Sequence, residues 1–270
     1  MTLDFNYSPN DLIPYIDWPH FLFAWGFKGM NMHTAEAQEL QEEALTVVAE
    51  MQDGGATIRC RVRILDAHRE GDDLVVYAST IPLRIPCLRQ QVCDKGSNVY
   101  RCLADYLAPA GLQHPIGNRI GVFATATHVP ALSQPLTAYR KMMLQTLADR
   151  LAEAAAERVH HEALHQEWGK PFAQPISGIR PAVGYPSLPD MSVNFVLEKI
   201  LDFNDLGIRL TENGMMIPHA AVSGFIFAHP EARYFNVGLI SEEQFLDYAR
   251  RKEVAPQALQ KFIPQVVKTT

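Results

Sequence analysis

Apolar and polar positions alternate with a helical period over two long stretches of the chain. A rhythm rich in Ala, Glu and Leu predicts an amphipathic helix from about Thr34 to Met51. A longer pattern predicts a helix over Leu136–Trp168, with a slim face at Ala152–Ala156 and an end at Gly169-Lys170-Pro171. Shorter helices are predicted at Cys102–Leu107, at Val193–Phe203 and after Ser241, where Ser241-Glu242-Glu243-Gln244 has the form of a capping box.

The remaining apolar runs have the length and composition of β-strands, and turn-prone stretches such as Glu70-Gly71-Asp72-Asp73 separate them. The predicted strands are Ala56–Leu65, Leu74–Thr80, Ile81–Ile85, Arg119–Thr127, Ala220–Ala228 and Arg233–Ile240. No internal repeat or low-complexity linker divides the chain. We therefore predict a single α+β domain over residues 1–270.

Composition narrows the possible functions. The 270 residues are 47% apolar and carry a net charge of −6, which is ordinary for a globular protein with a sizeable core. No basic stripe is present to neutralise phosphates, and no apolar run is long enough to span a bilayer. The first residues lack the pattern of a signal peptide, and the four cysteines lack C-x-x-C spacing. We expect a cytoplasmic protein with reduced thiols and without nucleic-acid or membrane partners, although four cysteines also permit disulfides.

The segment Gly178–Pro186 has the features of a binding loop. Its two prolines favour extended conformations at Arg180 and Tyr185, while Gly184 tolerates backbone angles that other residues avoid. A stiff loop of this kind offers a planar guanidinium to a carboxylate and an aromatic face to a heterocycle. An ordinary connecting turn is the alternative for the loop alone.

Three further positions allow either a functional or a structural interpretation. Glu153 lies among alanines on the helix face that should pack inward, so it either reaches solvent at the edge or meets a ligand or cation. Asp17 stands in an aromatic run, where it either caps a short helix or contributes to a site. Tyr234-Phe235 belongs either to a strand core or to a binding surface.

His161-Glu162-Ala163-Leu164-His165 matches the H-E-x-x-H spacing of zinc metalloproteases, which places two imidazoles on one helix face with a general base between them. Three features argue against zinc. The neighbours are polar, Trp168 stands where the extended motif has glycine, and no histidine follows at the third-ligand position. The alternative is a solvated helix end whose histidines complement the helix dipole.

Taken together, these segments resemble the activation domain of cobalamin-dependent methionine synthase, its C-terminal S-adenosylmethionine-binding module. The resemblance covers nearly the whole chain, and the loop around Arg180 is its most specific part. The matching motifs include Ile16-Asp17-Trp18, Arg89-Gln90-Gln91, Leu103–Tyr106, Leu147–Ala154, Gly178–Pro186, Ala221–Gly224, Tyr234–Ile240 and Asp247–Lys252.

The resemblance implies a fold with a central twisted, mainly antiparallel sheet flanked by long helices. It also implies a site for S-adenosylmethionine formed by Asp17, Glu153, Arg180, Ala182, Gly184, Tyr185, Tyr234 and Phe235. In this site the arginine would clamp the methionyl carboxylate, and the two acids would meet the ammonium, the sulfonium or the ribose hydroxyls. The loop tyrosine and the backbone beside it would frame the adenine or ribose.

The function implied by the resemblance is repair of cob(II)alamin by reductive methylation, with flavodoxin or a similar protein as electron donor. Such a domain mainly holds the reactants in line. We expect the cobalamin to arrive on a separate methionine synthase polypeptide or another corrinoid protein. The chain departs from the family pattern at Ser187–Val193, which lacks the usual histidine, and at His219, where a small residue is common.

Two alternatives remain open from the sequence. One is a module that binds S-adenosylmethionine, or only a partner, for another corrinoid methyltransferase without catalysis of its own. The other is the zinc hydrolase suggested by His161 and His165.

Overall fold

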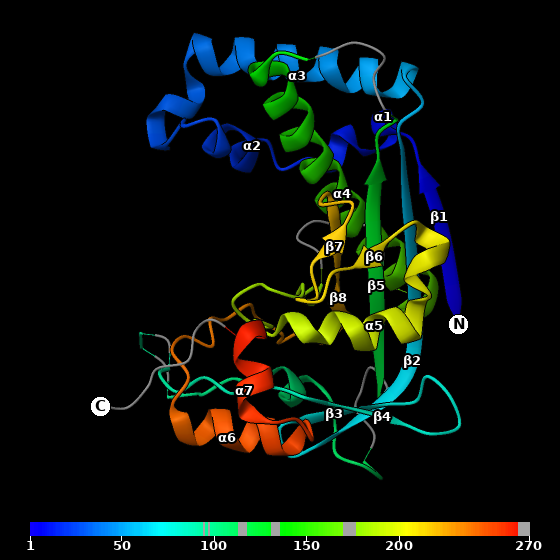
Figure 1. The fold of residues 1–270 in the computed structure, drawn as a ribbon, viewed down its shortest axis with the longest axis vertical. Helices are drawn as coiled ribbons and strands as arrows, with labels where there is room; N and C mark the ends of the chain where they lie inside the picture. Colours follow the sequence, from blue (N-terminus) through cyan, green and yellow to red (C-terminus); the bar gives the residue numbers. More distant parts are fainter. Residues whose placement is uncertain (94, 97, 113–117, 131–135, 170–176, 264–270) are drawn as a thin grey trace.

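Two long antiparallel strands, β2 (Thr57–Glu70) and β5 (Arg119–His128), form the axis of the computed structural model, and most other elements are arranged around them (Figure 1). The structure describes residues 1–93, 95–96, 98–112, 118–130, 136–169 and 177–263. The sheet has the order β4-β3-β2-β5-β8, and β1 also pairs with β2. The other strands are β1 (Thr2–Tyr7), β3 (Asp73–Val76), β4 (Leu83–Pro86) and β8 (Ala221–Ile226), with β6 (Arg209–Leu210) and β7 (Met216–Ile217) as a separate pair.

Strand β2 is long enough to take part in two halves of the sheet. Its first part, Ile58–Arg63, pairs with β1 on one side and with β5 on the other. Its last part, Ala67–Glu70, pairs with β3, and β3 in turn pairs with β4. All these pairings are antiparallel, so the predicted sheet type is confirmed.

Helices cover both faces of the sheet. Figure 1 shows α1, α2 and α3 at one end of the strand pair, α4 running from that end along the strands, and α5, α6 and α7 toward the other end. The helices are α1 (Pro9–Leu12), α2 (Trp18–Ala24), α3 (Ala35–Asp53), α4 (Ala138–Trp168), α5 (Asn194–Leu201), α6 (Glu242–Arg251) and α7 (Pro256–Leu259). The predicted long helix is therefore confirmed as α4, and Gly169 ends it in a left-handed conformation, while Lys170 and Pro171 lie outside the described residues.

Alternate side chains of β5 enter two different cores, as expected for a central strand. Its even-numbered residues, such as Val122, join a cluster with α5 and α6. The odd-numbered Phe123 joins a second cluster with α3 and α4. On the same face, Thr125 and Thr127 donate hydrogen bonds to the carbonyl oxygens of Ala152 and Ala148 at 2.9 and 3.0 Å. The alanine-rich face of α4 therefore packs closely on the sheet.

One predicted strand is wrong. Residues Arg233–Ile240, all of them described, follow an irregular path instead of forming a strand, with a single β-bridge at Ile240. Side chains and loop backbone, in place of a neighbouring strand, form hydrogen bonds with the backbone of this segment. The amide of Val237 donates to the carbonyl of Pro186 at 2.9 Å, and the carbonyl of Asn236 accepts from the side chain of Gln90. Apolar content alone does not distinguish this arrangement from a ladder.

Other boundaries shift, and several short elements were missed, among them α1, α7 and the β6–β7 pair. Strand β3 ends at Val76 and β4 begins at Leu83, while β2 extends five residues beyond the predicted end at Leu65. Strand β1 was not predicted. Only half of the capping box forms: the hydroxyl of Ser241 accepts from the amide of Gln244 at 3.3 Å, but the Gln244 side chain accepts from the amide of Arg89.

Among the described helices, none combines the length and apolarity needed to cross a membrane. Cys60, Cys87, Cys93 and Cys102 are free thiols, and three of them are buried. The cytoplasmic location stays a prediction.

Candidate ligand-binding groove

The Arg180 loop runs along the edge of β8 and is fixed to it on both sides of the arginine. The amides and carbonyls of Ile179 and Phe227 exchange hydrogen bonds at 3.0 and 2.9 Å, and the amide of Phe225 donates to the carbonyl of Pro181 at 3.0 Å. Gly224 permits this approach, because a Cβ there would lie 2.2 Å from the Pro181 carbonyl oxygen. The backbone of Arg180 is therefore held in place by backbone hydrogen bonds of its neighbours.

The side chain of Arg180 reaches helix α4. Its Nη2 lies 2.7 Å from Oε2 of Glu157, and its Nη1 lies 3.3 Å from Nδ1 of His160. The backbone amide of Arg180 donates to the hydroxyl of Tyr234 at 2.9 Å. With 14% of its surface exposed, the Arg180 side chain forms part of a wall, with its guanidinium at the groove.

Glu153 meets a loop residue. Its Oε1 accepts a short hydrogen bond from the hydroxyl of Tyr185. Desolvation of that hydroxyl, and then the nearby carboxylate, raise the pKa of Tyr185, although 48% of the residue surface is exposed. Tyr185 is therefore a half-exposed aromatic residue whose hydroxyl is tied to Glu153.

Asp17 performs the capping role considered above and also borders a hollow. Its Oδ1 accepts from the amide of His20 at 3.0 Å, at the start of α2. Asp17, Glu153, Glu157, Arg180 and Tyr185 line a cavity of about 300 Å³ together with residues 14–16 and Arg150. Segments far apart in the sequence thus bring three carboxylates and two guanidinium groups to one hollow.

A second, larger hollow of about 590 Å³ continues from the first. It shares Glu153, Arg180 and Tyr185 with the first and adds Ala182 and the Tyr234-Phe235 pair. Tyr234 is 60% exposed, whereas Phe235 is only 6% exposed and mainly belongs to the core. The two hollows form one groove over the Arg180 loop, which we call the Arg180 groove.

A third hollow of about 250 Å³ adjoins this groove through Glu153 and Tyr185. Its wall is partly apolar, with Met191, Met215 and Met216, and its rim carries Asp149 and His219. Nδ1 of His219 lies 3.3 Å from Oδ1 of Asp149, so the residue that departs from the family pattern pairs with a carboxylate at the rim.

Gly184 has a structural role in the loop. It has a positive φ of 87°, its amide donates to the carbonyl of Leu188 at 2.8 Å, and a Cβ would lie 2.7 Å from the sulfur of Met191. The residues lining the Arg180 groove include its neighbours Ala182 and Tyr185 but not Gly184. Its contribution is to turn the chain so that Tyr185 faces the groove.

Two of the sequence motifs hold the Tyr234 segment from behind. The side chain of Gln90 donates to the carbonyl of Asn236 at 3.1 Å and accepts from the amide of Arg101 at 3.0 Å. The hydroxyl of Tyr106 donates to the carbonyl of Arg233 at 3.0 Å and accepts from the Arg233 amide at 3.2 Å. These contacts bracket Tyr234-Phe235 on both sides and fix a segment that has no strand partner.

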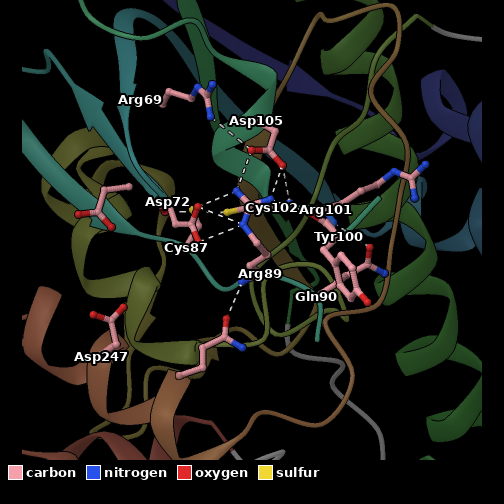
Figure 2. Close-up of polar contacts among 12 residues, drawn as sticks. Arg69, Asp72, Cys87, Arg89, Gln90, Tyr100, Arg101, Cys102, Asp105 and Asp247 are labelled. Atoms are coloured by element: carbon pink, nitrogen blue, oxygen red, sulfur yellow. Dashed lines mark hydrogen bonds and ion pairs between the residues drawn. The ribbon is translucent and has the colours of Figure 1, made fainter. Parts of the chain in front are cut away.

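Figure 2 shows the charged cluster next to Gln90, in which Arg89 lies between Asp72 and Asp105. Its Nε and Nη2 bond to Asp72, its Nη1 and Nη2 bond to Asp105, and Nη1 also bonds to the carbonyl of Tyr100. Hydrogen bonds to the two carboxylates raise the pKa of Arg89. This arginine joins the turn before β3 to the segment after β4.

The H-E-x-x-H residues do not meet as ligands. His161 is buried, lies 3.6 Å from Glu157 and contacts the ring of Tyr15, while His165 is exposed. Within the described ranges, no group of three His, Cys, Asp or Glu side chains is arranged to hold a metal ion.

Sequence reasoning missed Glu157 and His160 as site residues. Both follow Glu153 on α4, at four and seven residues, so helical periodicity places all three on one face. That spacing was the available signal. The predicted meeting of Arg180 with Asp17 and Glu153 holds at the level of a shared hollow, whereas the direct ion pair is with Glu157.

The groove offers a cation for a carboxylate, acids for an ammonium or for hydroxyls, and exposed aromatic faces. These features define a binding module with a mixed-charge groove beside an antiparallel sheet. The chain belongs to the family described as "Vitamin B12 dependent methionine synthase, activation domain", whose model matches residues 9–253.

A solved structure supports this assignment. The chain is similar to the structure titled "Crystal Structure of the MetH Reactivation Domain bound to AdoHcy", with 29% sequence identity and a TM-score of 0.85. The match covers 100% of this chain and 91% of the other. The predicted family and fold class are therefore confirmed.

Proposed function

We propose that the Arg180 groove binds S-adenosylmethionine, and that the chain supports reductive methylation of cob(II)alamin carried by a separate methionine synthase polypeptide or a related corrinoid protein. Residues 1–270 would act as one activation domain. The family assignment supports the reaction class, and the AdoHcy bound in the similar structure supports the ligand.

The observation that carries the proposal is the convergence of the predicted residues. Asp17, Glu153, Arg180 and Tyr185 come from three separate segments and line one hollow. Arg180 would clamp the ligand carboxylate, because a guanidinium forms two parallel hydrogen bonds with it. The acids would favour the ammonium and the sulfonium, and Tyr185 and Tyr234 would contact the adenosine.

The chemistry asked of this chain is positioning. One electron from flavodoxin or a similar donor, plus a methyl cation from S-adenosylmethionine, converts cob(II)alamin to methylcobalamin and releases S-adenosylhomocysteine. No proton moves in that balance, so the chain need not supply an acid or base. Its residues would hold the sulfonium methyl in line with the cobalt of the partner.

A second candidate function differs from the first in the corrinoid protein with which the chain works. His219 pairs with Asp149 at the rim of the third hollow, which adjoins the groove. A histidine at a position where the family commonly has a small residue favours a corrinoid partner with a different contact surface. Under this second candidate, the chain binds S-adenosylmethionine for another corrinoid methyltransferase.

Calorimetric titration with S-adenosylmethionine tests the proposed ligand. We expect wild-type protein to bind and Arg180→Ala to lose about tenfold or more in affinity, because a charged hydrogen-bonded pair is removed. Arg250→Ala is the matched control, since Arg250 is 75% exposed on α6 and its ion pair among the described residues is with Asp247, three residues earlier on the same helix. Wild-type protein that does not bind, or Arg180→Ala that binds unchanged, contradicts the proposal.

A further inference from the structure

Behind the Arg180 groove, helix α4 presents a buried histidine to the arginine. His160 has 0% of its surface exposed, and its Nδ1 lies 3.3 Å from Nη1 of Arg180. Glu157, one turn earlier on the same helix, holds Nη2 at 2.7 Å. Arg180 is thus contacted by two side chains of one rigid element, which is how a flexible side chain is given a single orientation.

The contact fixes the protonation state of His160. A guanidinium only donates hydrogen bonds, so Nδ1 must accept and the ring proton must lie on Nε2. Burial, followed by the positive charge of Arg180 and the neighbouring His161, lowers the pKa of His160 well below its usual range. The imidazole is therefore neutral and acts as a pure acceptor toward the arginine.

This arrangement carries a penalty that packing alone does not explain. Among the described residues, Nε2 of His160 has no hydrogen-bond partner although it is buried. A buried donor without a partner is destabilising, and an apolar side chain of similar size would avoid the loss. A histidine has an advantage over an apolar side chain here only if the lone pair on Nδ1 accepts a hydrogen bond that serves the site.

On the basis of the proposed function, we propose that His160 is a positioning residue for Arg180. Its Nδ1 holds Nη1 against α4, so that the guanidinium presents its remaining N–H groups to the ligand carboxylate. A second carboxylate at this place would give the cluster a net negative charge that repels a ligand carboxylate, since Glu157 already pairs with the arginine, and a cation would repel the guanidinium. A neutral acceptor orients the guanidinium without adding a second negative charge.

Two ligands and two variants test this role. S-Adenosylmethionine carries the carboxylate that Arg180 would clamp, and decarboxylated S-adenosylmethionine lacks only that group. His160→Phe keeps the ring volume without an acceptor, whereas His160→Asn places an oxygen near the position of Nδ1. His160→Gln, which moves its polar group toward the position of Nε2, replaces the phenylalanine variant if that variant does not fold.

We expect His160→Phe to bind S-adenosylmethionine about tenfold more weakly than wild type, as for the loss of a hydrogen bond to a charged group. The same variant should bind the decarboxylated ligand within about threefold of wild type, and His160→Asn should retain most of the affinity for both. Equal losses for the two ligands would show a merely structural role and overturn the inference. An unchanged affinity in His160→Phe would overturn it as well.

The proposed function fails separately from this inference. If wild-type protein binds neither ligand, the function itself is wrong. If wild-type protein binds, Arg180→Ala loses affinity and His160→Phe does not, then only the role of His160 is wrong.

Discussion

Two arginines with carboxylate partners, Arg89 and Arg180, show how differently the same side chain is used in this molecule. In the cluster of Figure 2, all three nitrogens of the Arg89 guanidinium bond to Asp72, Asp105 or the Tyr100 carbonyl. Arg180 has Glu157 and His160 as its side-chain partners among the described residues. Yet Arg180 is the less exposed of the two, at 14% against 30%.

The difference separates a structural arginine from the one that we propose to bind a ligand. Arg89 has its hydrogen-bonding capacity used within the fold, and it joins the turn before β3 to the segment after β4. Arg180 borders a groove and is held from one side by helix α4, with hydrogen-bonding capacity left for a ligand. From burial alone, Arg180 would be taken as the structural arginine, because its side chain is the less exposed of the two.

The largest expected difference between the two sites is in stability. Arg89→Leu should lower the free energy of unfolding by about 3 kcal/mol, because two partly buried carboxylates lose their shared cation. Arg180→Leu should lower it by about 1 kcal/mol, since it leaves a single partly buried carboxylate, Glu157, without its cation. Urea denaturation of both variants measures the difference.

Arg250→Leu serves as the control for that experiment and should change the free energy of unfolding by less than about 0.5 kcal/mol. Equal losses in Arg89→Leu and Arg180→Leu would remove the distinction between the two arginines.

A smaller expected difference between the two sites is in the pH range over which each contributes to the free energy of unfolding. The pKa of His160 is lowered in the folded protein, so below the usual value of 6.5 the unfolded chain binds a proton that the folded chain does not. This contribution to stability is complete above pH 6.5 and is lost as the pH falls, with a slope of at most about 1.4 kcal/mol per pH unit. Urea denaturation between pH 5 and 8 measures it.

The Arg89 cluster responds at more acidic pH. Burial raises the pKa of Asp105, but hydrogen bonds from Arg89 and from the Cys102 amide outweigh burial and lower it overall. Its contribution is therefore present above the usual value of 3.8 and is lost below it. His160→Asn should flatten the profile between pH 5 and 6.5 only, and parallel profiles for variant and wild type would contradict the assignment.

Much of the fold could be predicted because its long elements have strong patterns. Helix α4 follows from its periodicity and strand β5 from its apolar run, and the structure confirms both to within about two residues. The segment Arg233–Ile240 could not be predicted correctly, because it has strand-like composition but is held by Gln90 and Tyr106 from distant parts of the chain. No local pattern encodes such partners.

For the candidate site, the sequence identified part of the groove lining but missed Glu157, which lines the first hollow, and His160, which contacts Arg180 from behind. Asp17, Glu153, Arg180 and Tyr185 were predicted, and the structure brings them to one hollow. Their binding roles stay proposals. His160 was seen only as part of a polar helix end, because its contact depends on where the Arg180 loop crosses α4, which is a tertiary property.

The most direct test of the account is a crystal structure of this protein with S-adenosylmethionine bound. The account predicts a carboxylate oxygen of the ligand within about 3 Å of the Arg180 guanidinium, with Asp17 or Glu153 at its ammonium or ribose hydroxyls. A ligand outside the Arg180 groove, or one whose carboxylate points away from Arg180, would contradict it.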